Sequence, residues 1–190
     1  MRKGIINIVL ILFCGSSFIF NAAYCQDSTN TKNLKVIIIR HAEKPVKGDN
    51  LTCQGINRSL ELPGLLSSKF GIPDYIYVPS LGLGQSTKHS RMFQTVIPLA
   101  AKYNLSINSK YDEKDSSGIA NDIKTKQGTV LIVWEHHAIP PIVAALGVSD
   151  YNLVWDDTDF DSIWIITFSN GMVTLTKDKE GLMPPVGCPY

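Results

Sequence analysis

The sequence predicts an α/β protein: a three-layer α/β/α sandwich with a mostly parallel central sheet and an antiparallel hairpin at its edge. Two observations lead to this fold class. From residue 34 onward, short β-branched runs alternate with longer segments of helical periodicity. Near the end of the chain, two strand-like runs at 162–168 and 172–176 are separated by Ser169, Asn170 and Gly171, which is typical of a hairpin.

Residues 1–25 have the layout of a secretory signal peptide, with a basic start, an apolar run and small residues near the end. Cleavage is expected between Cys25 and Gln26, which predicts a secreted or periplasmic protein without a stable membrane span after processing. A lipid anchor on Cys25 is the alternative, and Tyr24 disfavours it because such anchors follow a small residue.

The rest of the chain divides into a polar, flexible lead at 26–33 and one domain at 34–190, which is long enough for a sizeable core. The 18 basic and 17 acidic residues are nearly balanced, so no nucleic-acid partner is expected. Cys53 and Cys188 are the cysteines outside the signal peptide, and they form either a disulfide or two buried thiols.

The first half of the domain begins with a β-branched run at 36–39, as expected of a strand buried on both faces. Thr52 can cap the following helix, which Pro63 and Gly64 are expected to kink or restart. A short strand at 75–78 and a glycine- and serine-rich stretch then lead to a helix at 91–103.

In the second half, Ser116 or Ser117 is expected to cap a third helix that Gly128 ends. A buried strand at 129–134 follows, and then a helix at 138–146 that prolines open. The hairpin comes next, and the proline- and glycine-rich tail is expected to lie over the surface.

Both buried strands end at histidines. Arg40 and His41 follow the first strand, and His136 and His137 follow the second. Because the carboxyl ends of parallel strands share one rim, we expect these groups to meet there. The N-terminus of the helix at 138–146 favours an anion at the same place, and Arg91 offers a second guanidinium group.

These groups suit the hydrolysis of a phosphate ester. A neutral imidazole can attack phosphorus and form a phosphohistidine, which divides one difficult hydrolysis into two displacements. Arginines and a second histidine can hold the phosphoryl oxygens, so neither a metal nor a cofactor is expected. A protonated carboxyl group must assist the leaving oxygen.

Four ordered segments resemble the histidine phosphatase superfamily, specifically its small, single-domain, phosphoglycerate mutase-like members. "VIIIRHAEKP" from Val36 resembles the strand and R-H-G-E loop, and "LTCQGINRS" from Leu51 resembles the L-T-x-x-G segment. "SRMFQT" from Ser90 resembles the R-A-x-Q-T segment, and "VLIVWEHHAIP" from Val130 resembles the later strand with the second histidine.

The resemblance implies that His41 is the nucleophile and that Arg40, Arg91 and His136 bind phosphate. His136 is preferred to His137 because it comes first after the strand. Glu43, within the R-H-x-E loop, is expected to organise that loop.

The resemblance leaves the proton donor open among three acidic residues. Glu113, in the segment after the second arginine, is ranked first, and Asp112 and Glu135 are the alternatives.

We therefore expect an exported histidine-type acid phosphatase that acts on small phosphorylated substrates. A non-catalytic phosphate-binding module of the same fold is the alternative. A metal-dependent hydrolase built on His136, His137 and the acidic residues at 156–161 is disfavoured, because adjacent histidines are awkward joint ligands and the arginines would repel a cation.

Overall fold

The structure is a computed structural model that describes residues 33–82, 87, 89–150 and 152–190. The predicted signal peptide and nearly all of the predicted lead lie outside the described residues. Within the described ranges, no helix is both long enough and apolar enough to cross a membrane.

The central sheet is mixed, and its strands are β1 Leu34–Arg40, β2 Tyr75–Tyr77, β3 Ile107–Asn108, β4 Gly128–Trp134, β5 Ser162–Ser169 and β6 Met172–Lys179. Their order across the sheet is β3-β2-β4-β1-β5-β6. The first four strands in this order are parallel, whereas β5 runs antiparallel to β1 and β6 antiparallel to β5. The predicted mostly parallel sheet with an antiparallel edge hairpin is thus confirmed.

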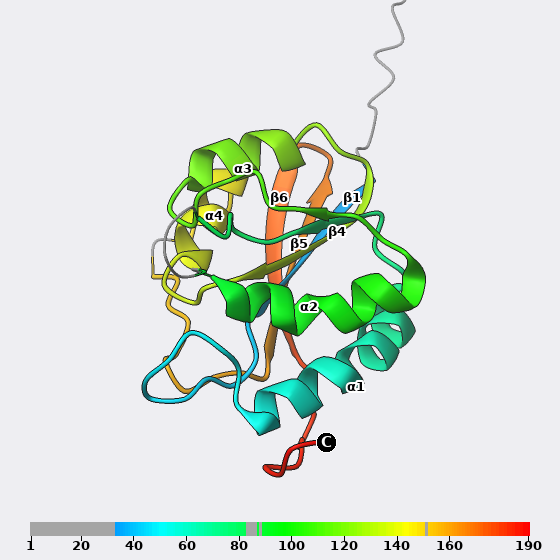
Figure 1. The fold of residues 1–190 in the computed structure, drawn as a ribbon. Coiled ribbons are helices and arrows are strands. Elements are labelled where there is room, and N and C mark those ends of the chain that lie inside the picture. The colour runs from blue at the N-terminus through cyan, green and yellow to red at the C-terminus, as the bar shows by residue number, and fades with distance from the viewer. Residues whose placement is uncertain (1–32, 83–86, 88, 151) are drawn as a thin grey trace, which may run out of the picture.

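Helices cover both faces of this sheet, and they are α1 Cys53–Phe70, α2 Ser90–Tyr103, α3 Ser116–Ile123 and α4 Ile139–Leu146. Figure 1 shows α1 and α2 on one face of the sheet and α3 and α4 on the other. Side chains of β1 alternate between the two layers: Ile37 and Ile39 pack with α1 and α2, and Val36 and Ile38 pack with α3 and α4. This alternation explains why β1 carries an uninterrupted apolar run at 36–39.

Three expectations about helices are wrong: the restart offered as one alternative for α1, the cap of α3 and the end of α3 at Gly128. α1 does not restart at Pro63, because the buried Leu62 and Leu66 on either side of it hold one continuous helix against the sheet. Asp115 caps α3 in place of Ser116 or Ser117, and its Oδ1 accepts a hydrogen bond of 2.8 Å from the backbone N–H of Gly118.

Gly128 does not end α3, which stops at Ile123, but is instead the first residue of β4. Its φ of 88° suits glycine, and a Cβ there would lie 2.2 Å from Oδ2 of Asp74. The strand β3 was not predicted, because two residues are too few to show a periodicity.

The C-terminal tail is bound to α1. Cys53 and Cys188 form a disulfide with a Cα–Cα distance of 4.4 Å, which settles the alternative that the sequence left open. Nδ2 of Asn57 donates to the carbonyl oxygens of Pro185 (2.8 Å) and Gly187 (2.6 Å). The tail therefore lies along the start of the helix that follows the histidine loop.

Candidate active site

His41 lies directly after β1, where its backbone N–H donates to the carbonyl of Trp134 and extends the pairing with β4 (3.1 Å). The side chain is buried, and its Nδ1 donates to the carbonyl of Ala42 (2.7 Å). This bond places the proton on Nδ1 and leaves the lone pair on Nε2. Burial lowers the pKa of His41 to about 3, and the positive charges of Arg40 and Arg91 act in the same direction. The imidazole is therefore neutral near pH 7.

The loop after His41 is tied to α2. The backbone N–H of Ala42 donates to Oγ1 of Thr95 (2.9 Å), and this hydroxyl donates to the carbonyl of Arg91 one turn earlier (2.8 Å). Oε1 of Gln94 accepts from the N–H of Leu51 (2.9 Å) and holds the next part of the chain. The R-M-F-Q-T segment thus positions the histidine loop as well as Arg91.

The same loop is also tied to α1. The carbonyl of Glu43 accepts from the backbone N–H of Thr52 (2.9 Å), and Gly55 lies against it so closely that a Cβ would come within 2.4 Å. The Glu43 carboxylate accepts from Nε and Nη2 of Arg58 at 3.0 and 2.8 Å. Glu43 therefore joins the loop to α1, as expected of an organising residue.

Arg40 and Arg91 each have a buried Nε–H without an acceptor among the described residues. Nη1 of Arg40 donates to the carbonyls of Asp157 (2.7 Å) and Asp159 (3.3 Å), and its guanidinium lies 4.0 Å from the centre of the Phe160 ring. Nε of Arg40 and Nε of Arg91 are buried and have no hydrogen-bond partner among the described residues. Since buried donors are normally satisfied, these two atoms indicate the place of an anionic ligand.

His136 is buried beside the same groups. Its charge, like those of Arg40 and Arg91, acts on the pKa of His41. Burial lowers the pKa of His136, and the nearby Arg40 lowers it further. His137 is exposed, although the two rings lie 3.9 Å apart. The structure thus brings together His41, His136, Arg40 and Arg91, whereas the His137 side chain is exposed beside them.

The three candidate donors differ in their surroundings. Asp112 is exposed, and its Oδ1 accepts from the N–H of Lys114 in its own turn (3.1 Å). Glu135 lies against Nδ1 of His136 with one oxygen and accepts from the N–H of His137 with the other (2.8 Å). These two carboxylates are occupied by local contacts.

Glu113 is the candidate whose environment favours protonation. Burial raises its pKa, the neighbouring Glu135 raises it further, and His89 opposes them from 3.0 Å. Glu113 and Glu135 line a hollow of about 180 Å³ together with His137 and Pro141. A carboxyl group in this setting can hold a proton at a pH where ordinary carboxyl groups are ionised.

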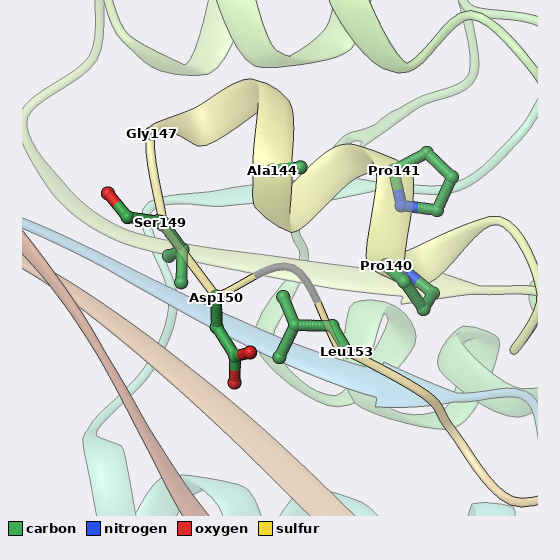
Figure 2. A pocket seen from close by; sticks show the side chains of 8 residues that line it. Pro140, Pro141, Ala144, Gly147, Ser149, Asp150 and Leu153 are labelled. Atoms are coloured by element: carbon green, nitrogen blue, oxygen red, sulfur yellow. The ribbon is translucent and has the colours of Figure 1, made fainter.

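A larger hollow of about 550 Å³ lies along α4 and the residues that follow it. Figure 2 shows Pro140, Pro141, Ala144 and Leu153 around it. None of the predicted site residues lines this hollow.

Sequence reasoning missed two contributors. The acidic residues at 156–161 entered the sequence analysis only through the disfavoured metal-dependent hydrolase, yet Oδ1 of Asp157 lies 2.9 Å from Nε2 of His136. His89 was not among the predicted site residues, yet it pairs with Glu113. Neither contact has a signal in the sequence, because each joins distant segments that meet only in the folded chain.

Fold and site together define an α/β protein whose candidate site, with Arg40, His41 and His136, lies after the carboxyl ends of the parallel strands β1 and β4. No protein-family model matches the chain, and no curated protein matches it at a significant level. Solved structures do resemble it. A phosphoserine phosphatase mutant from Entamoeba histolytica, in complex with phosphoserine, shares 14% identity and a TM-score of 0.53, covering 78% of this chain and 97% of its own.

Two further solved structures resemble the chain to a similar degree. The protein histidine phosphatase SixA, complexed with tungstate, has 15% identity and a TM-score of 0.56, covering 77% of this chain and 97% of its own. A phosphoglycerate mutase from Bacillus anthracis has 14% identity and a TM-score of 0.51, with 78% and 94% covered. All three are members of the histidine phosphatase superfamily, and this chain has their fold.

Proposed function

We propose that the protein is a phosphatase that hydrolyses small phosphate monoesters through a phosphohistidine on His41. One combination of groups carries the proposal. The imidazole of His41 is neutral and buried, and the Nε–H groups of Arg40 and Arg91 have no acceptor among the described residues. The phosphatases among the structural neighbours support the same reaction.

In the first step, the Nε2 lone pair of His41 forms a bond to phosphorus while the bond from phosphorus to the leaving oxygen breaks. Arg40, Arg91 and His136 hold the three remaining phosphoryl oxygens as negative charge redistributes. The carboxyl group of Glu113 gives its proton to the leaving oxygen, and the alcohol departs.

In the second step, a water oxygen attacks phosphorus, and the electron pair of the N–P bond returns to Nε2. The water proton passes to the Glu113 carboxylate, which restores the protonated donor and releases inorganic phosphate. The hydrogen bond from Nδ1 to the Ala42 carbonyl keeps His41 in the required tautomer throughout.

The proposed roles determine the pH dependence of turnover. The nucleophile must be neutral, and its pKa of about 3 leaves it neutral above that pH. The donor must be protonated, so turnover is expected to fall as the pH rises through the raised pKa of Glu113. This is the pattern of an acid phosphatase, and Glu113→Gln should abolish the limb that falls with pH.

The central experiment replaces His41. His41→Asn should reduce turnover of an aryl phosphate to background, and vanadate should inhibit the native protein. The matched control is His137→Asn, which removes an exposed imidazole close to the site and should retain turnover. Normal turnover by His41→Asn would disprove the phosphohistidine mechanism.

The second candidate is a module that binds phosphate without hydrolysing it. It is favoured by one observation: the ion pair with His89, which opposes protonation of Glu113. Calorimetric titration with inorganic phosphate, run beside a panel of phosphorylated metabolites, separates the two. Binding without release of phosphate from any panel member would favour the module.

We also propose that the protein is exported and that residues 1–25 are removed. The disulfide between Cys53 and Cys188 supports this, because disulfides persist in oxidising compartments. N-terminal sequencing of the secreted protein should begin at Gln26, whereas a lipid-modified Cys25 at the N-terminus would establish the anchor instead.

A further inference from the structure

Glu180 is a buried acidic residue that the proposed reaction does not use. It lies directly after β6, and its side chain is 1% exposed. Its Oε2 accepts a hydrogen bond from Nη1 of Arg58, whose side chain is also buried. A carboxyl oxygen can accept an N–H whether the group is ionised or protonated, so this contact does not depend on one protonation state. The pairing explains how an acidic side chain is tolerated at this buried position.

Arg58 connects Glu180 to the histidine loop. Nη2 and Nε of Arg58 donate to the Glu43 carboxylate at 2.8 and 3.0 Å, while Nη1 donates to Glu180. Because the guanidinium group is planar and rigid, its three nitrogens cannot move independently. Glu43 is two residues from His41 in the same loop. A displacement of Glu180 is therefore transmitted through Arg58 to the loop that carries the nucleophile.

The backbone of Glu180 is attached to the loop that holds the Arg40 side chain. The N–H of Glu180 donates to the carbonyl of Asp161 (2.7 Å), and the N–H of Asp161 donates to Oδ1 of Asp159 (2.9 Å). In the same loop, the Asp159 carbonyl accepts from Nη1 of Arg40 (3.3 Å), and the Phe160 ring lies 4.0 Å from the Arg40 guanidinium. Glu180 thus contacts this loop with its backbone and reaches the histidine loop with its side chain.

We propose that Glu180 is a positioning residue that joins these two loops. Its side chain fixes the histidine loop through Arg58, and its backbone fixes the loop against which the Arg40 guanidinium lies. A residue near the C-terminus thereby sets the nucleophile against a side chain that binds phosphate. The effect on turnover rests on the proposed function, whereas the effect on phosphate affinity does not.

The first test removes the acceptor and keeps a side chain of similar size. Glu180→Leu leaves Nη1 of Arg58 without its acceptor, and kcat/KM for an aryl phosphate should fall by at least about tenfold, since a displacement of about 1 Å can cost about 100-fold. Glu180→Gln keeps an oxygen that accepts from Arg58 and should retain most of the native kcat/KM. If Glu180→Leu does not fold, Glu180→Asp replaces it, because the shorter side chain withdraws the carboxyl group from Arg58.

The matched control is Asn57→Ala, which releases the C-terminal tail from α1 and leaves the pairs of Arg58 in place. Nδ2 of Asn57 donates to the carbonyls of Pro185 and Gly187. The control should lower the urea midpoint of unfolding and keep the native kcat/KM in the folded protein, whereas Glu180→Leu should lower both. Native kcat/KM in Glu180→Leu would make Glu180 a structural residue only. A comparable loss in Asn57→Ala would also overturn the proposal, because any loosening of the tail would then suffice.

A double-mutant cycle tests whether Glu180 acts through Arg58. Arg58→Lys keeps the positive charge, but a single ammonium group cannot replace the fork that spans Glu43 and Glu180. This variant should lose at least about tenfold in kcat/KM, and adding Glu180→Leu to it should cause little further loss, since both changes break one connection. Independent, multiplying losses would refute the connection through Arg58.

Phosphate affinity separates this proposal from the proposed function. In calorimetric titrations, inorganic phosphate should bind native protein and Asn57→Ala with equal affinity, and Glu180→Leu about tenfold more weakly because Arg40 loses its support. If this order holds but the native protein hydrolyses no phosphate ester, the proposed function fails and the positioning role stands. If the native protein hydrolyses phosphate esters and Glu180→Leu matches it in kcat/KM and phosphate affinity, the positioning role fails and the proposed function stands.

Discussion

The contact between Gly55 and Glu43 gives a sharp test of how α1 supports the histidine loop. A Cβ on residue 55 would lie 2.4 Å from the Glu43 carbonyl oxygen and 3.0 Å from its nitrogen, whereas ordinary contacts begin near 3.4 Å. Gly55→Ala must therefore push the loop and the helix apart by about 1 Å, and both groups are backbone atoms that cannot rotate away.

This separation should affect both stability and turnover. Overpacking of this kind costs about 1–3 kcal/mol, and a shift of about 1 Å in a loop that carries the nucleophile can lower kcat/KM by about 100-fold. Gly64→Ala is the matched control, because it lies in the same helix with no atom within 4 Å of its Cβ. The control should stabilise the helix by about 1 kcal/mol, since alanine is the better helix former.

Urea unfolding and turnover of an aryl phosphate would be measured for both variants. Gly55→Ala should be less stable than the native protein, and Gly64→Ala should be more stable. Turnover should fall in Gly55→Ala alone. If Gly55→Ala retained native kcat/KM and native stability, the close packing of the L-T-x-x-G segment on the histidine loop would not position the site.

Three further perturbations have defined outcomes. Replacing Cys53 and Cys188 together by serine opens a link across 135 residues, and thermal unfolding should show a loss of at most about 5 kcal/mol. Thr95→Val leaves the buried N–H of Ala42 without an acceptor, so urea unfolding should show a loss of about 1–3 kcal/mol together with lower turnover. Burial raises the pKa of Glu180 to about 7, so the fold favours its protonated form and stability should decrease as the pH rises through 7. Urea unfolding of Glu180→Gln across this range should lack the decrease, which is about 3 kcal/mol at most.

Much of the fold follows from local patterns. The β-branched runs of β1 and β4 predict buried strands, and Ser169, Asn170 and Gly171 predict the hairpin. Both signals are local, because apolar periodicity and turn residues can be recognised within a few positions. α1 continues through Pro63 against local preference, because burial of Leu62 and Leu66 outweighs the lost hydrogen bond. The cap of α3 was misplaced by one or two residues, since Asp115, Ser116 and Ser117 are all residue types that favour a cap position.

The candidate site, like the fold, could be predicted from the sequence only in part. The sequence by itself determined that His41 and His136 follow parallel strands, because strand direction alone puts their carboxyl ends on one rim. Only the tertiary structure decided which groups surround them. The contacts from Asp157 to His136, from His89 to Glu113 and from Cys53 to Cys188 join segments that no local pattern relates. Such contacts depend on where loops end in space, which is set by the packing of the whole sheet and its helices.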